Sequence, residues 1–204
     1  MNGLESLFFI LAMIMAYLLG AIPFGYIIYK IRKGDDIRET GSGNIGATNV
    51  YRSAGRAFGL LTLLLDILKG ILAVLIAKGM VEQADLALLA APIAIAGHMF
   101  PVFLRFKGGK GVATALGAFA MIAPWALLVS IAVFLAVALA FRIISLASIS
   151  AAAVFPLAAF LFEGGWILPV IAGICSLLII VRHHTNISRI FRGTEKHIWR
   201  KAAQ

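Results

Sequence analysis

Long apolar runs separated by short polar stretches dominate this chain. Each run can be compared with the roughly 20 residues that cross a bilayer as a helix. The six runs are Leu4 to Tyr29, Phe58 to Ala77, Leu86 to Leu104, Val112 to Phe141, Ile143 to Phe162 and Trp166 to Val181. The first run has no basic region before it and is too long for a signal sequence, so we interpret it as a retained span. The pattern predicts an all-α integral membrane protein.

The run from Val112 to Phe141 is too long for one upright helix. Pro124 lies in its middle, where proline favours the start of a new helix over the continuation of the old one. Splitting the run there gives a short helix, Val112 to Ile122, and a longer one that begins at Pro124. The prediction is therefore seven transmembrane helices.

The placement of charge supports the split. Without it, Arg142 and the basic C-terminal tail would lie opposite the other basic loops, against the positive-inside rule. With it, all but two of the 18 Lys and Arg residues share one side. These residues are in Lys30 to Arg56, in Arg105 to Lys110, at Arg142, and in the tail at Arg182, Arg189, Arg192, Lys196, Arg200 and Lys201. We predict an external N-terminus and a cytoplasmic C-terminus in a bacterial cytoplasmic (inner) membrane.

Composition agrees with a single transmembrane domain over residues 1–204. Apolar residues make up 62% of the chain and charged residues 13%, and the mean hydropathy of +1.00 is far outside the soluble range. The net charge of +9 fits positive-inside loops and anionic lipids or substrates. Aromatic and basic residues do not alternate as they do on nucleic-acid surfaces, so no nucleic acid is expected. The single Cys175 excludes an intrachain disulfide.

The first polar segment runs from Gly41 to Arg52. Its three glycines permit positive φ angles that turn several N–H groups toward one point, as in an anion nest. Arg52 adds a planar guanidinium suited to phosphate. Neutral hydrogen-bonding groups come from Ser42, Asn44, Thr48 and Asn49. We interpret the segment as a loop, either an anion site or a plain connector.

The second polar segment runs from Gly97 to Thr114. Its centre, Lys107 to Gly111, opens the short helix, so free N–H groups, the helix dipole and Lys110 would together favour a phosphate. A basic turn with snorkelling side chains is the alternative. A nucleotide P-loop is excluded because Gly111 follows Lys110 where Ser or Thr is required, and Leu104 replaces the first glycine.

Asp66, Lys69 and His98 are ionisable residues in the interior of predicted spans. Asp66 and Lys69 are one turn apart and can pair, and we favour a structural role over a functional one. His98 is expected to hydrogen-bond between helices. No acid stands at Phe103, so His98 lacks the aspartate of a His-x4-Asp acyltransferase dyad.

The third polar segment, Arg182 to Arg189, follows the last span and precedes Glu195. His183 and Asn186 are three residues apart and share a helix face, where they can bind a hydroxyl or phosphate. A basic tail on anionic lipid is the alternative. Ser145 and Ser148 add hydroxyls at the same level, and acids are too few for a metal site. Together the segments indicate an enzyme or carrier for phosphate-bearing substrates, at least one of them lipidic.

The three segments Gly41 to Arg52, Gly97 to Thr114 and Arg182 to Arg189 resemble, in order and spacing, the cytoplasmic motifs of the bacterial acyl-phosphate-dependent glycerol-3-phosphate acyltransferase family. The resemblance covers essentially the whole chain. It implies transfer of a fatty acyl group from acyl phosphate to the sn-1 hydroxyl of glycerol 3-phosphate, which gives lysophosphatidic acid and phosphate in the first acylation of phospholipid synthesis. No cofactor or metal is implied, and the substrate's own phosphate is expected to take the proton. Membrane lipid and an enzyme that hands over acyl phosphate are the expected partners.

The resemblance also implies roles for individual residues. Lys110, His183, Asn186 and Ser42 are expected to be catalytic. The acyl-phosphate head group is assigned to Ser42, Gly43, Asn44, Thr48, Asn49, Gly108, Gly109, Lys110 and Gly111. Glycerol 3-phosphate is assigned to Arg52, Ser148, His183 and Asn186. Structural roles are assigned to Asp66, Lys69 and Glu195, the last holding the tail in place.

Two other functions stay open at this point. A transporter for organic phosphates would also gather basic residues near a membrane face, but usually places its site near the midplane between repeats, and no repeat is visible. A lipid phosphotransferase would need an acidic metal cluster, which the sequence does not offer.

Overall fold

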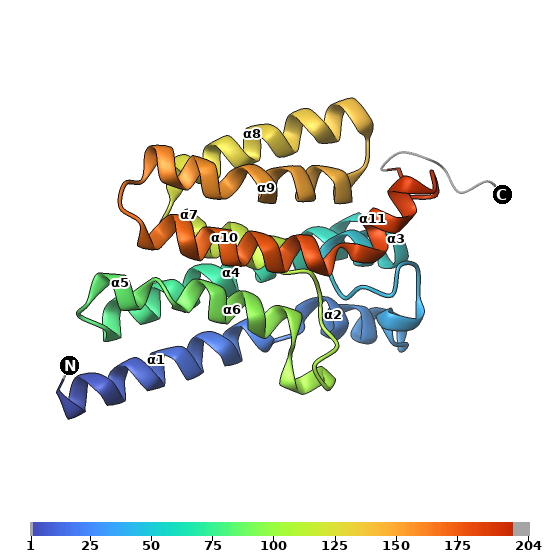
Figure 1. The fold of residues 1–204 in the computed structure, drawn as a ribbon. Coiled ribbons are helices and arrows are strands. Elements are labelled where there is room, and N and C mark those ends of the chain that lie inside the picture. The colour runs from blue at the N-terminus through green and yellow to red at the C-terminus, as the bar shows by residue number, and fades with distance from the viewer. Residues whose placement is uncertain (1, 198–204) are drawn as a thin grey trace. The chain divides into compact units, whose positions relative to one another are not determined.

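The computed structural model describes residues 2–197, which are helical or irregular, without a β-strand. They divide into two compact units, with the boundary between Ile122 and Ala123. Arg200 and Lys201, which the charge argument used, lie outside the described residues. The first unit contains α1 (Gly3–Ala21), α2 (Phe24–Lys33), η1 (Ile37–Glu39), α3 (Ala47–Ala54), α4 (Arg56–Met80), α5 (Ala84–Ala87), α6 (Ala90–Met99), η2 (Val102–Leu104) and α7 (Val112–Ala120) (Figure 1). The second contains α8 (Pro124–Phe141), α9 (Ile144–Phe162), α10 (Ile167–Arg182) and α11 (His184–Phe191).

Among residues 2–197, five segments are long and apolar enough to cross a membrane. They are residues 3–33, 56–80, 84–104, 124–141 and 144–162. A sixth is obtained if α10 and α11, which meet at a bend of 57°, count as one span. At nine residues and a rise of about 1.5 Å per residue, α7 reaches only about half of the hydrocarbon core. The all-α membrane fold is confirmed, whereas the count of seven spans stays a prediction.

The break at Pro124 is confirmed. Helix α7 ends at Ala120, and α8 begins with Pro124 in its first turn. The missing N–H of proline costs nothing there, because first-turn N–H groups have no partner within the helix. Glu163 Oε1 accepts from the backbone N–H of Ala126 at 3.0 Å, which satisfies one of the remaining donors.

The first predicted span is not one continuous helix. Residues 3–33 count as one candidate span, as expected, but helix α1 ends at Ala21 and α2 begins at Phe24. Pro23 cannot donate to the helix ladder, and it disfavours helical geometry at Ile22. The Ile22 carbonyl instead accepts from the Lys69 ammonium at 2.9 Å. The third predicted span is broken in a similar way, between α5 and α6.

Close helix packing in the first unit depends on glycine. A Cβ atom at Gly20 of α1 would lie 2.1 Å from the Ala94 carbonyl oxygen of α6, and one at Gly117 of α7 would lie 1.9 Å from that of Ile67 of α4. Small residues allow such backbone contact between membrane helices. The packing of α6 and α7 on their neighbours therefore fixes where the second polar segment begins and ends.

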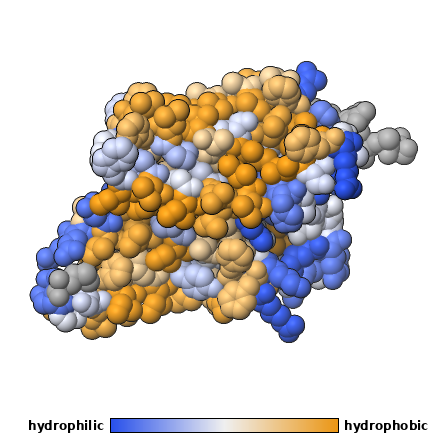
Figure 2. All heavy atoms as spheres, viewed as in Figure 1, coloured by the Kyte–Doolittle hydropathy of each residue, from blue (hydrophilic) through white to orange (hydrophobic). Residues whose placement is uncertain are grey.

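On the face drawn in Figure 2, much of the helix surface is apolar (orange). In the second unit α8 packs beside α9 and α9 beside α10 (Figure 1). Large side chains remain exposed along α1, including Leu4, Leu7, Ile10 and Ile14, and along α8 and α10, including Leu128, Leu139, Val170 and Leu177. Exposed apolar surface on this scale is the property expected of helices that face lipid.

Candidate functional site

The first polar segment is a loop followed by a helix. Residues 41–46 are irregular, but α3 begins at Ala47, so the expectation of a loop as far as Arg52 is wrong. Gly41 and Gly43 take the positive φ angles expected of an anion nest, 67° and 71°. Gly46, with φ at −78°, is instead the N-cap residue of α3. Two of the three glycines are therefore conformational requirements of the loop.

Asn49 holds this loop in shape from within α3. Its side-chain oxygen accepts from the Ser42 N–H at 2.9 Å. Its amide nitrogen lies 2.9 Å from the carbonyl oxygens of Thr40 and Asn44 and 3.4 Å from that of Ile37. Asn49 is only 3% exposed. Asn49 therefore stabilises the conformation of the loop. Its assignment to the acyl-phosphate head group stays a prediction.

The loop presents a polar outer surface over an apolar base. Ser42, Gly43, Thr48 and Arg52 are exposed. Thr48 and Arg52 are four residues apart on α3 and so share a face of that helix. A small core of Tyr29, Ile37, Ile45, Val50 and Leu104 lies beneath. This core fixes the backbone, so the polar side chains project from a rigid platform.

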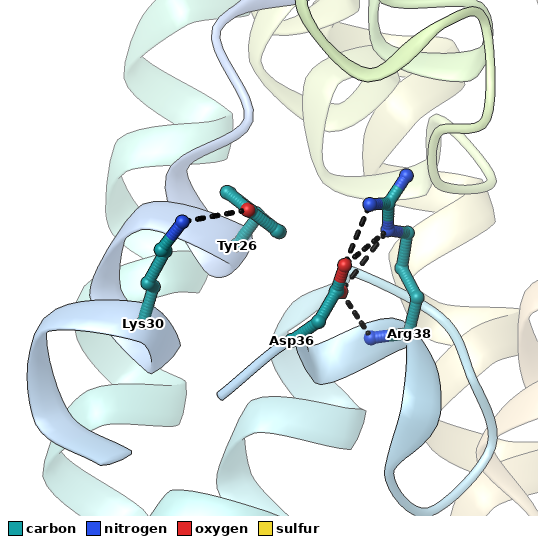
Figure 3. A network of polar contacts seen from close by, with 4 residues as sticks. All are labelled: Tyr26, Lys30, Asp36 and Arg38. Atoms are coloured by element: carbon teal, nitrogen blue, oxygen red, sulfur yellow. Dashed lines mark hydrogen bonds and ion pairs between the residues drawn. The ribbon is translucent and has the colours of Figure 1, made fainter. Parts of the chain in front are cut away.

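A group of charged residues lies beside this platform (Figure 3). Arg38 donates to both carboxylate oxygens of Asp36, at 2.6 to 3.0 Å. The Arg38 hydrogen bonds hold the pKa of Asp36 below its usual value. The cationic groups of Arg38 and Lys30 lie 5.5 Å and 5.6 Å from the centre of the Tyr26 ring. The sequence pattern does not predict this cluster, because it forms across the turn after α2.

Tyr26 also borders an open apolar groove of about 380 Å³ at the break between α1 and α2. The groove is lined by Ile22, Pro23, Tyr26, Ile27, Phe103 and Leu104. Its exposed surface is almost entirely apolar. Lys30 and Arg38 contact the ring of Tyr26, one of the lining residues, but are not part of the lining. Such a groove suits a hydrocarbon chain.

The second polar segment opens α7, as expected. Gly111 is the N-cap residue with φ at 81°, and the helix has no side-chain cap within the described part of the chain. Helix N-termini leave their first N–H groups without helical partners, and their dipole favours an anion. Lys110 immediately precedes this point. The arrangement therefore matches the chemistry of a phosphate-binding helix start.

The Gly108 and Gly109 segment lies directly on the C-terminal end of α6. The Gly109 N–H donates to the His98 carbonyl at 3.0 Å, and the Gly108 N–H donates to the Met99 carbonyl at 3.2 Å. A Cβ at Gly109 would lie 2.0 Å from His98 Nε2. Only glycine can approach the ring so closely.

Asp66, Lys69 and His98 form one buried cluster in the first unit. Lys69 Nζ lies 2.9 Å from Asp66 Oδ1 and 2.9 Å from His98 Nδ1, and Nδ1 is 3.7 Å from Asp66 Oδ1. All three residues are at most 4% exposed. From the sequence, Asp66 and Lys69 can be paired by their spacing, but nothing in the spacing connects His98 to them.

In the second unit, Glu195 connects three residues. Its Oε1 accepts from Ser145 Oγ at 2.8 Å and from Asn186 Nδ2 at 2.6 Å, and its Oε2 accepts from Arg189 Nε at 2.6 Å. Burial raises the pKa of Glu195, but these hydrogen bonds lower it by more, so the net pKa is below its usual value. The carboxylate thus ties the segment after α11 to α9 and α11.

His183 lies at the bend between α10 and α11 and is 2% exposed. Its Nδ1 is 2.7 Å from the Ile179 carbonyl oxygen. A carbonyl only accepts, so Nδ1 carries the proton, and Nε2 of the neutral ring is an acceptor. Ser148, also assigned to glycerol 3-phosphate, is buried in α9 and donates to the Ile144 carbonyl at 2.9 Å. Across residues 2–197, no group of three or more His, Cys, Asp or Glu side chains is arranged to hold a metal ion.

Comparison with known proteins places these features in a family. The model of the family described as glycerol-3-phosphate acyltransferase matches residues 10–193. The glycerol-3-phosphate acyltransferase of Syntrophotalea carbinolica is 47% identical over 92% of this chain and 96% of its own. That of Trichlorobacter lovleyi is 49% identical over 88% of this chain and 92% of its own.

Solved structures give the same result. A crystal structure of PlsY (YgiH), an integral membrane glycerol 3-phosphate acyltransferase, in its glycerol 3-phosphate form is 43% identical, with a TM-score of 0.87 over 93% of this chain and 94% of that one. The lysophosphatidic acid form of PlsY is 40% identical, with a TM-score of 0.84 over the same shares of the two chains.

Proposed function

Because this chain belongs to the glycerol-3-phosphate acyltransferase family, we propose that it transfers a fatty acyl group from acyl phosphate to the sn-1 hydroxyl of glycerol 3-phosphate. The products are lysophosphatidic acid and inorganic phosphate, so the reaction is the first acylation of phospholipid synthesis. The structures of PlsY with glycerol 3-phosphate and with lysophosphatidic acid support a phosphorylated acceptor and a lipid product. The acyl-phosphate donor and the sn-1 position are the parts proposed here.

The start of α7 is the observation that carries the proposal. Gly111 is the N-cap of α7 and Lys110 directly precedes it, so helix N–H groups, a helix dipole and a cationic residue are available in one short stretch. A donor that already bears phosphate would be recognised there by its leaving group. The same interactions would stabilise the negative charge that grows on this phosphate as the acyl–oxygen bond breaks.

The proposed step needs no strong protein base. The sn-1 oxygen attacks the acyl carbonyl carbon, an ester bond forms, and the bond between the acyl carbon and the phosphate oxygen breaks. The hydroxyl proton passes to a substrate phosphate. Acyl phosphate is an activated donor, so correct placement and charge stabilisation supply most of the rate.

The residue assignments extend this proposal. Ser42 in the first loop and Thr48 on the exposed face of α3, with Lys110, are proposed to bind the acyl-phosphate head group. Arg52 is proposed to bind the phosphate of glycerol 3-phosphate, to which Ser148, His183 and Asn186 of the second unit are also assigned. The Nε2 lone pair of His183 suits a glycerol hydroxyl, since Nδ1 donates to Ile179.

The acyl chain is proposed to occupy the apolar groove at the break between α1 and α2. Its lining is apolar, as the binding of a hydrocarbon chain requires. A donor with a fatty chain can then enter from the lipid. This explains why the reaction is carried out on membrane helices.

The proposed topology has seven spans, an external N-terminus, and an active site on the cytoplasmic face of the bacterial inner membrane. The basic loops support it through the positive-inside rule. A reporter fused after Gln204 should be cytoplasmic. An external reporter would overturn the topology.

One assay tests the donor. Purified protein in detergent is given acyl phosphate with and without glycerol 3-phosphate, and phosphate release is measured, with acyl-CoA as the competing donor. We expect release that depends on glycerol 3-phosphate and equals the lysophosphatidic acid formed. Turnover with acyl-CoA but not with acyl phosphate would show that acyl-CoA is the donor. Movement of glycerol 3-phosphate across vesicles without acylation would favour an organophosphate transporter.

A further inference from the structure

The buried cluster of Asp66, Lys69 and His98 has no part in the reaction as described above. It lies within the first unit, on α4 and α6, and each residue is at most 4% exposed. Ionisable groups inside membrane spans are costly, so a cluster of three calls for a reason beyond mutual neutralisation.

Lys69 sets the orientation of the His98 ring. Its Nζ lies 2.9 Å from Asp66 Oδ1, 2.9 Å from the Ile22 carbonyl oxygen and 2.9 Å from His98 Nδ1. An ammonium group has three N–H donors and no acceptor, so Nδ1 must accept. The neutral ring therefore carries its proton on Nε2, and its plane is fixed by the ammonium and by the helix break at Ile22.

The fixed ring faces the Gly108 and Gly109 segment. At Gly109, the three atoms closest to an added Cβ all belong to the His98 ring, at 2.0, 2.9 and 3.0 Å. Gly109 is not among the glycines with positive φ, so alanine would meet the ring but no backbone strain. At Gly108, by contrast, an added Cβ would meet the backbone oxygen of His98 at 2.2 Å.

We propose that His98 is a positioning residue: held by Lys69, its ring supports Gly109 and so sets where the loop places Lys110 and the N-terminus of α7. The proposal rests on the proposed function, in which this loop binds the acyl-phosphate head group. If the loop were displaced by about 1 Å, the turnover rate would fall strongly, because catalysis depends on the placement of groups at this scale. The buried cluster is then a support that joins the α1–α2 break, α6 and the loop.

A cycle of size changes tests the contact. The variants are Gly109→Ala, His98→Ala and the double variant, with KM and kcat measured for both substrates. In the parent, Gly109→Ala should raise the KM for acyl phosphate by about tenfold or more, because its methyl group collides with the ring. In the His98→Ala background the same change should cost less than about twofold, since the space is open and contacting residues are not additive.

Two further variants serve as controls. Gly108→Ala collides with backbone, so its cost should be the same in the parent and in the His98→Ala background. Thr62→Val removes a buried hydroxyl of α4 that lies outside the cluster and donates to the Phe58 carbonyl of its own helix. It should leave both KM values unchanged. If His98→Ala does not fold, His98→Asn keeps an acceptor for Lys69 without the ring and replaces it in the cycle.

The outcomes separate this proposal from the proposed function. Turnover of acyl phosphate by the parent tests the function, whereas the cycle tests the contact and can be read with whichever donor the enzyme uses. Equal costs of Gly109→Ala in both backgrounds would overturn the positioning role. An equal rise in the KM for both substrates in His98→Ala would also overturn it, because a general loss of structure would not single out the donor.

Discussion

Nζ of Lys69 and Nδ1 of His98, 29 positions apart in the sequence, lie 2.9 Å from each other inside the first unit. The contact joins α4 to α6 and turns an i, i+3 ion pair into a cluster of three residues. The ammonium is satisfied by acceptors from three parts of the chain, because the broken helix at Ile22 supplies the third.

Lys69→Met should destabilise the protein strongly. It leaves the Asp66 carboxylate buried without its cation, which costs about 3 to 5 kcal/mol in comparable sites. The double variant Asp66→Asn with Lys69→Met should recover much of this loss. Thermal unfolding in detergent measures both. Equal stability of the single and double variants would show that the ion pair is not the main interaction of the cluster.

Lys110→Ala should reduce kcat/KM by at least about 100-fold, because the cation at the start of α7 stabilises the leaving phosphate. The thermal unfolding midpoint should stay close to that of the parent. Lys107→Ala, an exposed lysine of the same loop, is the matched control and should retain most activity. Near-normal turnover of Lys110→Ala would remove Lys110 from the site.

Arg52→Ala should raise the KM for glycerol 3-phosphate about tenfold or more, with a smaller change for acyl phosphate, because a charged hydrogen bond to phosphate contributes about 1.5 to 3 kcal/mol. Steady-state kinetics with each substrate varied in turn measure the two values. Arg56→Ala, an exposed arginine at the start of α4, should change neither. The reverse pattern for Arg52 would exchange the assignment of the two phosphates.

His183→Ala should lower kcat/KM by about 100-fold while the pH profile keeps its shape. The reason is that Nε2 accepts a hydrogen bond from glycerol 3-phosphate while the proton is taken by a substrate phosphate. His184→Ala, which changes the exposed neighbour, should have little effect. A shifted acidic limb in the profile of His183→Ala would instead assign acid–base work to His183.

Glu195→Gln should destabilise the protein by about 1 to 3 kcal/mol at neutral pH, because charged hydrogen bonds from three residues become neutral. The folded pKa of Glu195 lies below its ordinary value of 4.5. Its charge therefore stabilises the fold fully above pH 4.5, and this contribution is lost as the pH falls through the folded pKa.

Unfolding of the parent and of Glu195→Gln, measured from neutral to acidic pH, checks this dependence. The difference in stability should shrink on the acidic side. Glu82→Gln, an exposed glutamate of the first unit, should show no such difference. A difference that grows toward low pH would contradict the assigned direction.

Much of the fold and part of the candidate site follow from local sequence. Apolar run lengths predicted helices that begin or end within a few residues of α4, α8, α9 and α10. Pro124 marked the start of α8, and Gly111 marked the start of α7, because proline and glycine act on the backbone directly. The glycine-rich motifs likewise carry their chemistry in a short stretch of chain, so the family resemblance was visible and is confirmed.

Long-range contacts were beyond the reach of local patterns. The sequence by itself determined helix type, the break at Pro124 and the residue types available for phosphate. Only the tertiary structure decided that the Asn49 side chain hydrogen-bonds the backbone of the preceding loop. It also decided that Glu195 accepts hydrogen bonds from Ser145 and Asn186, and that His98 lies between Lys69 and Gly109. Helix propensity depends on neighbours along the chain, whereas these contacts depend on how closely separate helices pack, which is set by glycines and side-chain shape across the interface.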